Sequence, residues 1–350
     1  MSNSQTPMTN DDTPLVSVVI PSYERPEFLP GAIETVLGQT YDPLEVVVVD
    51  DGSDTASDIV GDYADRSTRV TLHTHESNQG VSAARNTGIE RSSGDYVAFL
   101  DDDDRWHETK IARQMAAFDR CDENVGVVSC CLATVGPDGE ELRAERSKPT
   151  GDIQPEILRE NVVGSPSRVV VRRTCLDDIG GFDESLEAKQ DWDLYVRLSR
   201  TWRFETLQEV LCYRTVHDGG LSADPERAAR AFAAVREKHE STIRTHGCWD
   251  AAVANNHTTV GIVYLFRGER RAGRNHLSRA LRRDPSPVRS ALYASTFVPG
   301  AFGAIVDLKR WVERATDDRI RVEADAVPGT DEHGRPVEKR DAEIHQVERI

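Results

Sequence analysis

The sequence predicts an α/β fold, in which a doubly wound mixed sheet is followed by a helical C-terminal region. Two observations carry this prediction. Short apolar runs rich in valine alternate with segments of helical periodicity over the first two thirds of the chain. That alternation is typical of strands joined by crossover helices. Beyond Pro225 the strand-like runs stop, and Ala, Arg, Leu and His recur at helical spacing.

The expected strands are short and largely uncharged. They span residues 16–20, 44–49, 70–73, 96–100, 125–132, 167–171 and 210–214, and Pro21 is expected to end the first of them. The expected helices of the sheet region lie at residues 27–39, 59–63, 81–91, 106–118, 152–159 and 191–199. The expected C-terminal helices span residues 226–244, 251–267, 271–282 and 288–315.

These elements divide the chain into four expected segments. They are a polar tail (1–13), the sheet domain (14–222), the helical region (223–318) and a disordered charged tail (319–350). Within the helical region, the run from Gly261 to Pro285 resembles one tetratricopeptide-like hairpin.

Composition excludes some functions and favours a cellular location. The net charge of −17 argues against sequence-independent binding of nucleic acid, because phosphates would be repelled. Abundant aspartate with few lysines resembles a protein from a salt-loving organism. Six cysteines without CxxC spacing predict reduced thiols. The polar first 13 residues lack the features of a secretory signal, so we expect a cytoplasmic protein.

Carboxylates follow two of the expected strands. Asp101–Asp104 follow residues 96–100, where they form either a cation site or a capped turn. Asp50 and Asp51 follow residues 44–49. Because ligands bind at the carboxyl ends of strands in such sheets, we expect one shared crevice. Asp51 can accept a hydrogen bond from the ring imide of uracil or guanine, and alternate carboxylates suit Mg²⁺ or Mn²⁺ on a diphosphate.

Six motifs in order resemble family 2 glycosyltransferases. They are Val18-Val19-Ile20-Pro21-Ser22-Tyr23, Val49-Asp50-Asp51-Gly52-Ser53, Asn78-Gln79-Gly80 with Ala84-Arg85-Asn86-Thr87-Gly88, Phe99-Leu100-Asp101-Asp102-Asp103-Asp104, Gly180-Gly181-Phe182-Asp183, and Gln190-Asp191-Trp192-Asp193-Leu194. The resemblance covers residues 14–222. It implies the A-type glycosyltransferase fold, a nucleotide-sugar donor, a Mg²⁺ or Mn²⁺ cofactor, and inversion at the anomeric carbon.

The resemblance also assigns roles residue by residue. It places donor binding on Pro21, Tyr23, Glu24, Asp51, Arg85, Asn86, Asp101 and Asp102. It places the metal on Asp103, Asp101 and His217, and the general base on Asp191. The family's usual Glu-Asp pair is Gln190-Asp191 here, which removes a charge beside the base.

The expected reaction is therefore transfer of a sugar from a UDP- or GDP-sugar to a saccharide or lipid-linked acceptor. Such a reaction serves surface polysaccharide, lipid-linked glycan or protein glycan synthesis. Two alternatives remain open. A nucleotidyltransferase would carry an early glycine-rich basic loop, which residues 21–31 lack. A non-catalytic scaffold would bind sugar nucleotide and dock partners through its helices, a reading that Gln190 favours.

Two further features allow a plain and a functional interpretation. Trp106 and Trp192 are expected to pack in the core or walls rather than to stack on sugars. Seven arginines between residues 267 and 283 predict a solvated helix face. Beside the uncharged segment 290–306, they also allow peripheral association with anionic lipid at the inner face of the membrane.

Overall fold

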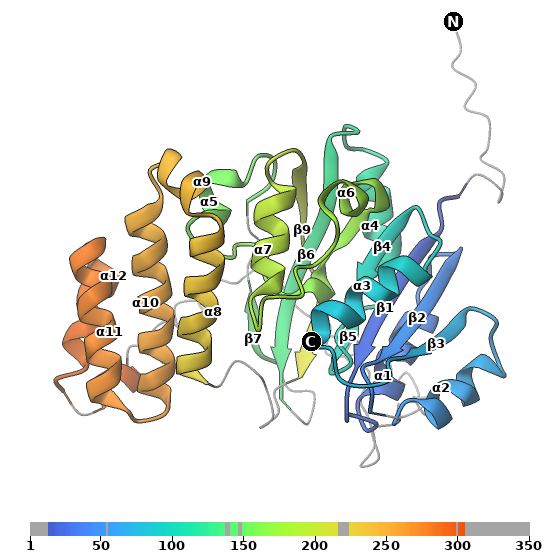
Figure 1. The fold of residues 1–350 in the computed structure, drawn as a ribbon, viewed down its shortest axis with the longest axis horizontal. Helices are drawn as coiled ribbons and strands as arrows, with labels where there is room; N and C mark the ends of the chain where they lie inside the picture. The colour runs from blue at the N-terminus through green and yellow to red at the C-terminus, as the bar shows by residue number, and fades with distance from the viewer. Residues whose placement is uncertain are drawn as a thin grey trace, which may run out of the picture.

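One mixed sheet organises the computed structural model of the chain (Figure 1). The structure describes residues 13–53, 55–136, 141–145, 149–215, 224–298 and 300–304. The strands within these ranges are β1 (Val16–Ser22), β2 (Leu44–Asp50), β3 (Val70–Thr74), β4 (Tyr96–Phe99), β5 (Asp104–Trp106), β6 (Val125–Val135), β7 (Glu141–Glu145), β8 (Val170–Arg172) and β9 (Arg203–Thr215). Their order is β3-β2-β1-β4-β8-β6-β9-β5, and β7 pairs with β6.

The helices within the described ranges cover both faces of this sheet and extend it at one end. They are α1 (Leu29–Leu37), α2 (Ser57–Ala64), α3 (Val81–Arg91), α4 (Lys110–Phe118), α5 (Gln154–Ile157), α6 (Arg173–Ile179), α7 (Gln190–Leu198), α8 (Pro225–Lys238), α9 (Glu240–Thr245), α10 (Trp249–Phe266), α11 (Arg270–Arg283) and α12 (Pro287–Ser295). None of them is both long and apolar enough to cross a membrane.

Strand direction places most carboxyl ends at one edge of the sheet. β1 is parallel to β2 and β4, and β2 is parallel to β3. β8 runs antiparallel to both β4 and β6, and β6 is parallel to β9. The strands β1–β4, β6 and β9 therefore all point toward the same edge, where ligands bind in such folds.

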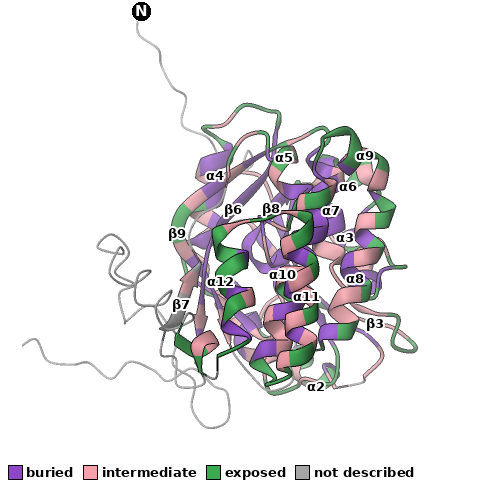
Figure 2. Cartoon of the chain, turned by 90° about the vertical axis from the view of Figure 1, so that its left-hand side faces the viewer, coloured by how far each residue is buried: buried purple, intermediate pink, exposed green. Residues whose placement is uncertain are grey.

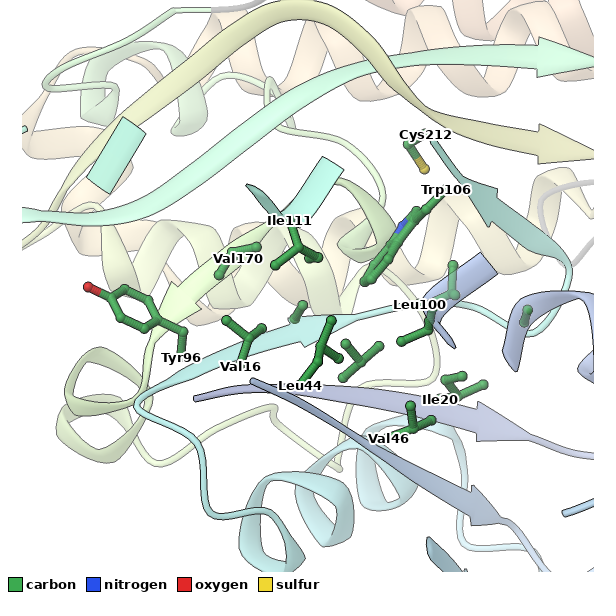
Figure 3. Close-up of a cluster of buried hydrophobic side chains, with 14 of the residues drawn as sticks. Val16, Ile20, Leu44, Val46, Tyr96, Leu100, Trp106, Ile111, Val170 and Cys212 are labelled. Atoms are coloured by element: carbon green, nitrogen blue, oxygen red, sulfur yellow. The ribbon is translucent and has the colours of Figure 1, made fainter. Parts of the chain in front are cut away.

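Alternating side chains divide the core between the two faces of the sheet. Val18 and Ile20 face a cluster that includes residues of α1, α2 and α4, part of which is drawn in Figure 3. Val19 faces the opposite cluster, to which α3, α5, α6, α7 and the first C-terminal helices contribute. β1 is buried along its whole length, as expected of a central parallel strand.

Several expected boundaries were wrong. Pro21 does not end the first strand, because β1 continues to Ser22 and pairs with β2 there. The expected helix 106–118 starts only at Lys110; the residues before it form β5, which pairs with β9. The last strand is not residues 210–214 but the long β9, and β7 was not expected. The expected helix 226–244 divides at His239. The tails at 1–12 and 305–350 lie outside the described residues.

The C-terminal helices attach to the sheet region through a buried carboxylate on α7. Asp193 is fully buried; its Oδ1 lies 2.8 Å from His239 Nε2 and 2.7 Å from Lys238 Nζ, and its Oδ2 lies 2.8 Å from Arg197 Nε. Burial would raise the pKa of Asp193, but the His239 hydrogen bond and the charges of Arg197 and Lys238 outweigh it and hold the pKa well below its ordinary value. The junction of α8 and α9 is thus fixed to α7. Figure 2 views the C-terminal helices from outside.

We expect Asp193→Ala to destabilise the protein by about 3–5 kcal/mol, because it leaves the largely buried Arg197 without its counter-charge and the buried His239 without its hydrogen-bond partner. Urea unfolding followed by circular dichroism measures this. The matched control is Glu240→Ala, which removes an exposed ion pair to Arg244 and should cost under about 1 kcal/mol.

The effect should also depend on pH. Because the folded-state pKa of Asp193 is depressed, its stabilising contribution is complete above the unfolded value of about 3.9 and disappears as pH falls through the folded-state value. Equal losses in the free energy of unfolding for Asp193→Ala and Glu240→Ala would contradict this account of the junction.

Candidate functional site

Three neighbouring strands end together at the ligand-binding edge of the sheet. The register pairs Ser22 of β1 with Asp50 of β2, and Val19 of β1 with Phe99 of β4. The two acidic segments therefore flank the end of β1 rather than lying on adjacent strands. The residues just after β1 lie between these two acidic segments, and one of them, Arg25, pairs with Asp102 and Asp103.

The carboxylates after β2 hold loops in place. Asp50 accepts hydrogen bonds from the backbone of Ser53 (3.0 Å) and Ala56 (3.2 Å), which orders the approach to α2. Asp51, only 3% exposed, accepts from the amides of Gln79 (2.9 Å) and Gly80 (2.8 Å), and its Oδ1 lies 2.8 Å from His75 Nδ1. A carboxylate offers about four acceptor positions, so one remains for a ring imide.

The residues expected to line a nucleoside lie around the end of β1. Pro21 is buried in the strand, opposite Val49. Tyr23 is 39% exposed, unusual for a large aromatic side chain in this structure. Glu24 has a φ of 53°, in the left-handed region that non-glycine residues seldom adopt, and it turns the chain toward Arg25. Their roles toward a nucleoside stay predictions.

The four consecutive aspartates divide into two kinds. The side chains of Asp101 and Asp103 are 30% and 19% exposed, whereas Asp102 is 6% exposed and residue Asp104 is 1% exposed. Arg85 pairs with Asp101 at 2.6 Å. One nitrogen of Arg25 bridges Asp102 (3.2 Å) and Asp103 (2.9 Å). The alternation puts Asp101 and Asp103 where a ligand reaches them.

The four carboxylates lie close to one another and to four arginines: Arg25, Arg85, Arg105 and Arg214. Burial raises the pKa of Asp102 to about 7, with the charge of Asp103 adding to it and that of Arg25 opposing it. Burial likewise raises the pKa of Asp104 to about 8, opposed by Arg214 and reinforced by Asp101 and Asp103. A divalent cation with a preference for carboxylate oxygens fits this donor set chemically. Within the described ranges, however, no three His, Cys, Asp or Glu side chains converge as a preformed metal cluster.

Two consecutive residues of α3 connect this edge to the later motif around Phe182. Arg85 pairs with Asp101, and its guanidinium lies 5.2 Å from the centre of the Phe182 ring. Asn86 donates to the Phe182 carbonyl (2.9 Å) and to Glu184 (2.7 Å), and it accepts from the Phe182 amide (2.8 Å). Asn86 therefore positions the loop, and Arg85 is the member of the pair that reaches the acidic edge.

The predicted base, Asp191, lies in the first turn of α7. Asn161 donates to its Oδ2 at 2.7 Å. Burial raises the pKa of Asp191, opposed by Lys189, the Trp192 amide and Arg85, while the charge of Asp101 adds to the rise. Arg85 and Asp101, which pair with each other, therefore lie within electrostatic range of the predicted base. A raised pKa suits a carboxylate that accepts a proton near neutral pH.

The Gln190 substitution has a local structural reason. Its Nε2 donates to the carbonyl of Leu186 at 3.0 Å, a bond that an ionised glutamate could not make. The side chain thus secures the loop before α7 instead of placing a charge beside Asp191. His217, the third predicted metal ligand, lies outside the described residues.

Three residues at the site were missed by the sequence analysis: Arg25, His75 and Asn161. His75 follows β3 at the ligand-binding edge, and that position at a strand end could have identified it. Its ring bridges Asp51 and Thr87, with Nε2 2.9 Å from the Thr87 hydroxyl. Nothing in the local pattern distinguishes Asn161, which reaches Asp191 across 30 residues.

The two tryptophans pack in the interior, as predicted. Trp106 is 1% exposed and donates to the Ser167 carbonyl at 2.7 Å; Trp192 is fully buried and donates to the Ile157 carbonyl at the same distance. Neither ring is available as a platform for a sugar.

Comparison with known proteins agrees with this geometry. Residues 17–180 match the model of the family described as glycosyl transferase family 2. An uncharacterized glycosyltransferase of Haemophilus influenzae is 26% identical over 65% of this chain and 78% of its own length. The amylovoran biosynthesis glycosyltransferase AmsB of Erwinia amylovora is 30% identical over 53% of this chain and 64% of its own, so the match leaves about a third of that relative uncovered.

Solved structures show the same fold. The mannosyltransferase PcManGT from Pyrobaculum calidifontis, determined with GDP-Man and Mn²⁺, aligns with a TM-score of 0.57 at 20% identity, over 88% of this chain and 88% of that chain. The mixed sheet agrees with the architecture that the six motifs implied, and the C-terminal helices agree with the helical spacing of the sequence beyond Pro225. The chain has the A-type glycosyltransferase fold, and its domain at residues 17–180 belongs to glycosyl transferase family 2.

Proposed function

We propose that the protein is an inverting glycosyltransferase that moves a sugar from a UDP- or GDP-sugar to an acceptor hydroxyl, in the synthesis of a surface polysaccharide or a related glycan. One observation carries the proposal. A carboxylate with a raised pKa, Asp191, stands close to the Arg85–Asp101 pair at the edge where Asp51 and Asp103 also lie. The arrangement supplies a base on the acceptor side and a charged site on the donor side.

The proposed reaction needs one proton transfer and one displacement. Asp191 takes the proton of the acceptor hydroxyl, whose oxygen forms a bond to the anomeric carbon. The bond from that carbon to the diphosphate oxygen breaks on the opposite side, and the nucleoside diphosphate leaves with the electron pair. A single in-line displacement inverts the anomeric centre and requires no covalent intermediate.

The donor-binding residues are proposed to bind the nucleotide at its base and at its diphosphate. Asp51 offers its remaining acceptor position to a uracil or guanine imide, and Tyr23 and Pro21 border the same strand end. Asp103 and Asp101 would hold Mg²⁺ or Mn²⁺, with His217 as a further candidate, and the ion would supply Lewis-acid stabilisation of the leaving diphosphate. AmsB, named for amylovoran biosynthesis, and PcManGT, solved with GDP-Man and Mn²⁺, support the polysaccharide and donor assignments.

Asp191→Asn should lower the transfer rate by about 10²–10⁴-fold, the usual contribution of a general base. Affinity for the nucleoside diphosphate should be unchanged, because the substitution spares the donor half. Activity is measured on the UDP- or GDP-sugar that the wild-type protein turns over, and affinity by isothermal titration.

The matched control is Asp178→Asn on an exposed turn of α6. It should change neither the transfer rate nor the affinity for the nucleoside diphosphate. Full activity of Asp191→Asn would reject the base assignment. Nucleotide binding by the wild-type protein without turnover of any donor would favour the scaffold alternative.

Asp103→Asn should reduce both Mn²⁺ affinity and transfer, the latter by about 10²-fold or more, since a bound cation supplies several kcal/mol of stabilisation to the developing charge. The exposed Asp178→Asn is again the control, because it makes the same change of charge on α6. Similar losses of Mn²⁺ affinity in the two variants would contradict the assignment of Asp103.

Removing the Asn161 hydrogen bond should move the pH profile of transfer. A bond to a charged group contributes about 1.5–3 kcal/mol, so its loss should raise the pKa of Asp191 and shift the acid limb upward by about 1–2 pH units. Asn161→Ala removes the hydrogen bond without adding charge. Asn161→Asp keeps an acceptor for the amides of Val163 and Gly164, but its carboxylate would repel that of Asp191 and raise the pKa further. An unchanged profile in this variant and in Asn161→Ala would show that Asn161 only shapes the loop.

A further inference from the structure

Exposed apolar side chains concentrate at one end of the C-terminal helices. Among the described residues, five large hydrophobic side chains are exposed, and four of them belong to the segment from α10 to just beyond α12. Phe266 ends α10 and is 64% exposed, while Phe297 and Val298 follow α12 and are 54% and 56% exposed. The fourth, Val288, is 69% exposed at the opposite end of α12 and stands apart from these three side chains. Phe266 also packs against Phe302, with ring centres 5.1 Å apart, although it stays largely exposed.

The helices bring these three side chains to a common tip. Arg270 and Arg274, on the first turns of α11, donate to the Thr296 carbonyl at 3.0 Å and 2.7 Å. The end of α12 therefore lies against the start of α11, which directly follows the end of α10. The Arg274 guanidinium covers the Phe297 ring at 4.0 Å. We call the group Phe266, Arg267, Arg271, Phe297 and Val298 the arm tip.

The arm tip is positive although the chain is strongly negative. The helix α11 carries six arginines and no carboxylate over Arg270–Arg283, whereas the whole chain has a net charge of −17. Arg267 and Arg271 are exposed. Acidic residues near Arg267 include Glu269, at 3.0 Å, and Asp224, whose pKa the charge of Arg267 helps to lower. Exposed Phe and Val among arginines match the interfacial region of an anionic bilayer, where apolar groups enter below charged headgroups.

The tip points in the same direction as the ligand-binding edge of the sheet. In Figure 1 the connection from α10 to α11 lies at the lower end, toward which β6 and β9 also point. Contacts at the other end agree, because Asn255 of α10 donates to the Arg159 carbonyl and Cys248 contacts Pro155, near the start of β9. A flat surface that meets the tip would therefore face the candidate site.

We infer that the arm tip docks on an anionic lipid surface and presents the site to an acceptor carried in that membrane. The inference rests on the proposed function for the identity of the acceptor, but the docking itself does not. Arginines supply long-range attraction, which salt screens, and the apolar side chains supply burial, which salt does not screen.

The test is co-sedimentation of the full chain with phosphatidylglycerol-containing vesicles and with pure phosphatidylcholine vesicles. We expect binding to the anionic vesicles and little to the neutral ones. Arg267→Glu with Arg271→Glu should weaken binding by about tenfold or more. Phe266→Ser with Phe297→Ser should weaken it as well, and this second loss should persist in molar KCl.

The matched control is Arg279→Glu with Arg282→Glu, the same change of charge near the opposite end of α11. It should bind nearly as the wild type does; an equal loss would show non-specific attraction and overturn the inference. Failure of the full chain to bind anionic vesicles would also overturn it, including the case in which residues 305–350 cover the tip. Hydrolysis of the sugar nucleotide, measured without vesicles, separates the docking hypothesis from the proposed enzymatic function. A protein that binds anionic vesicles but hydrolyses no sugar nucleotide would support docking and count against the proposed glycosyltransferase activity.

Discussion

Repulsion among the carboxylates after β4 is the constraint to which the surrounding structure responds. Arg85 from α3 and Arg25 from the segment after β1 pair with the cluster, and the charges of Arg105 and Arg214 act on it as well. The pairing of β5 with β9 then carries Asp104 into the interior. Burial, reinforced by this repulsion, keeps the pKa values of Asp102 and Asp104 raised despite these arginines. A cation bound at this edge would favour the ionised forms of the carboxylates.

The distance between the predicted donor site and the predicted base is set by packed elements more than by loops. Arg85 and Asn86 are consecutive on α3, yet one reaches Asp101 and the other holds the backbone of Phe182. The Phe182 ring also meets Phe99 edge-on, with ring centres 5.1 Å apart, and Phe99 ends the strand that carries the aspartates. Pre-organisation of this kind is what an in-line displacement between two bound molecules requires.

Strand and helix types were largely predictable because the periodicity of apolar residues reflects burial, and the sheet buries its central strands on both faces. The failures occurred where long-range pairing overrides local pattern. Asp104–Trp106 is too short and too polar to be recognised as a strand, and it exists because β9 is there to pair with it. Likewise β9 begins with alternating polar residues whose ladder partners lie 77 or 78 residues earlier in β6.

The candidate site also contains residues that the local sequence identifies and residues that only long-range contacts reveal. Strand ends located Asp51 and the aspartate cluster, because a carboxylate at the carboxyl end of a parallel strand is a local signal. Partners that arrive from elsewhere had no such signal: Arg25 bridges to residues 77 and 78 positions away, and Asn161 reaches Asp191 from a loop. Gln190 is the opposite case. It replaces the glutamate usual in the family motif, and its hydrogen-bond partner, the Leu186 carbonyl, lies only four residues away.

The helix α7 carries both the predicted base, Asp191, and the residue that attaches the C-terminal helices, Asp193. Asp191 and Asp193 are two residues apart, so about 200° of helical rotation separates them and they face opposite sides of α7. One side holds the predicted base near Arg85 and Asp101; the other holds Lys238 and His239 of the C-terminal helices. From that junction, α10 extends about 27 Å toward the arm tip. The tip is therefore connected to the base through packed helices, and any surface that the tip meets is held at a defined height from the carboxylate that would activate the acceptor.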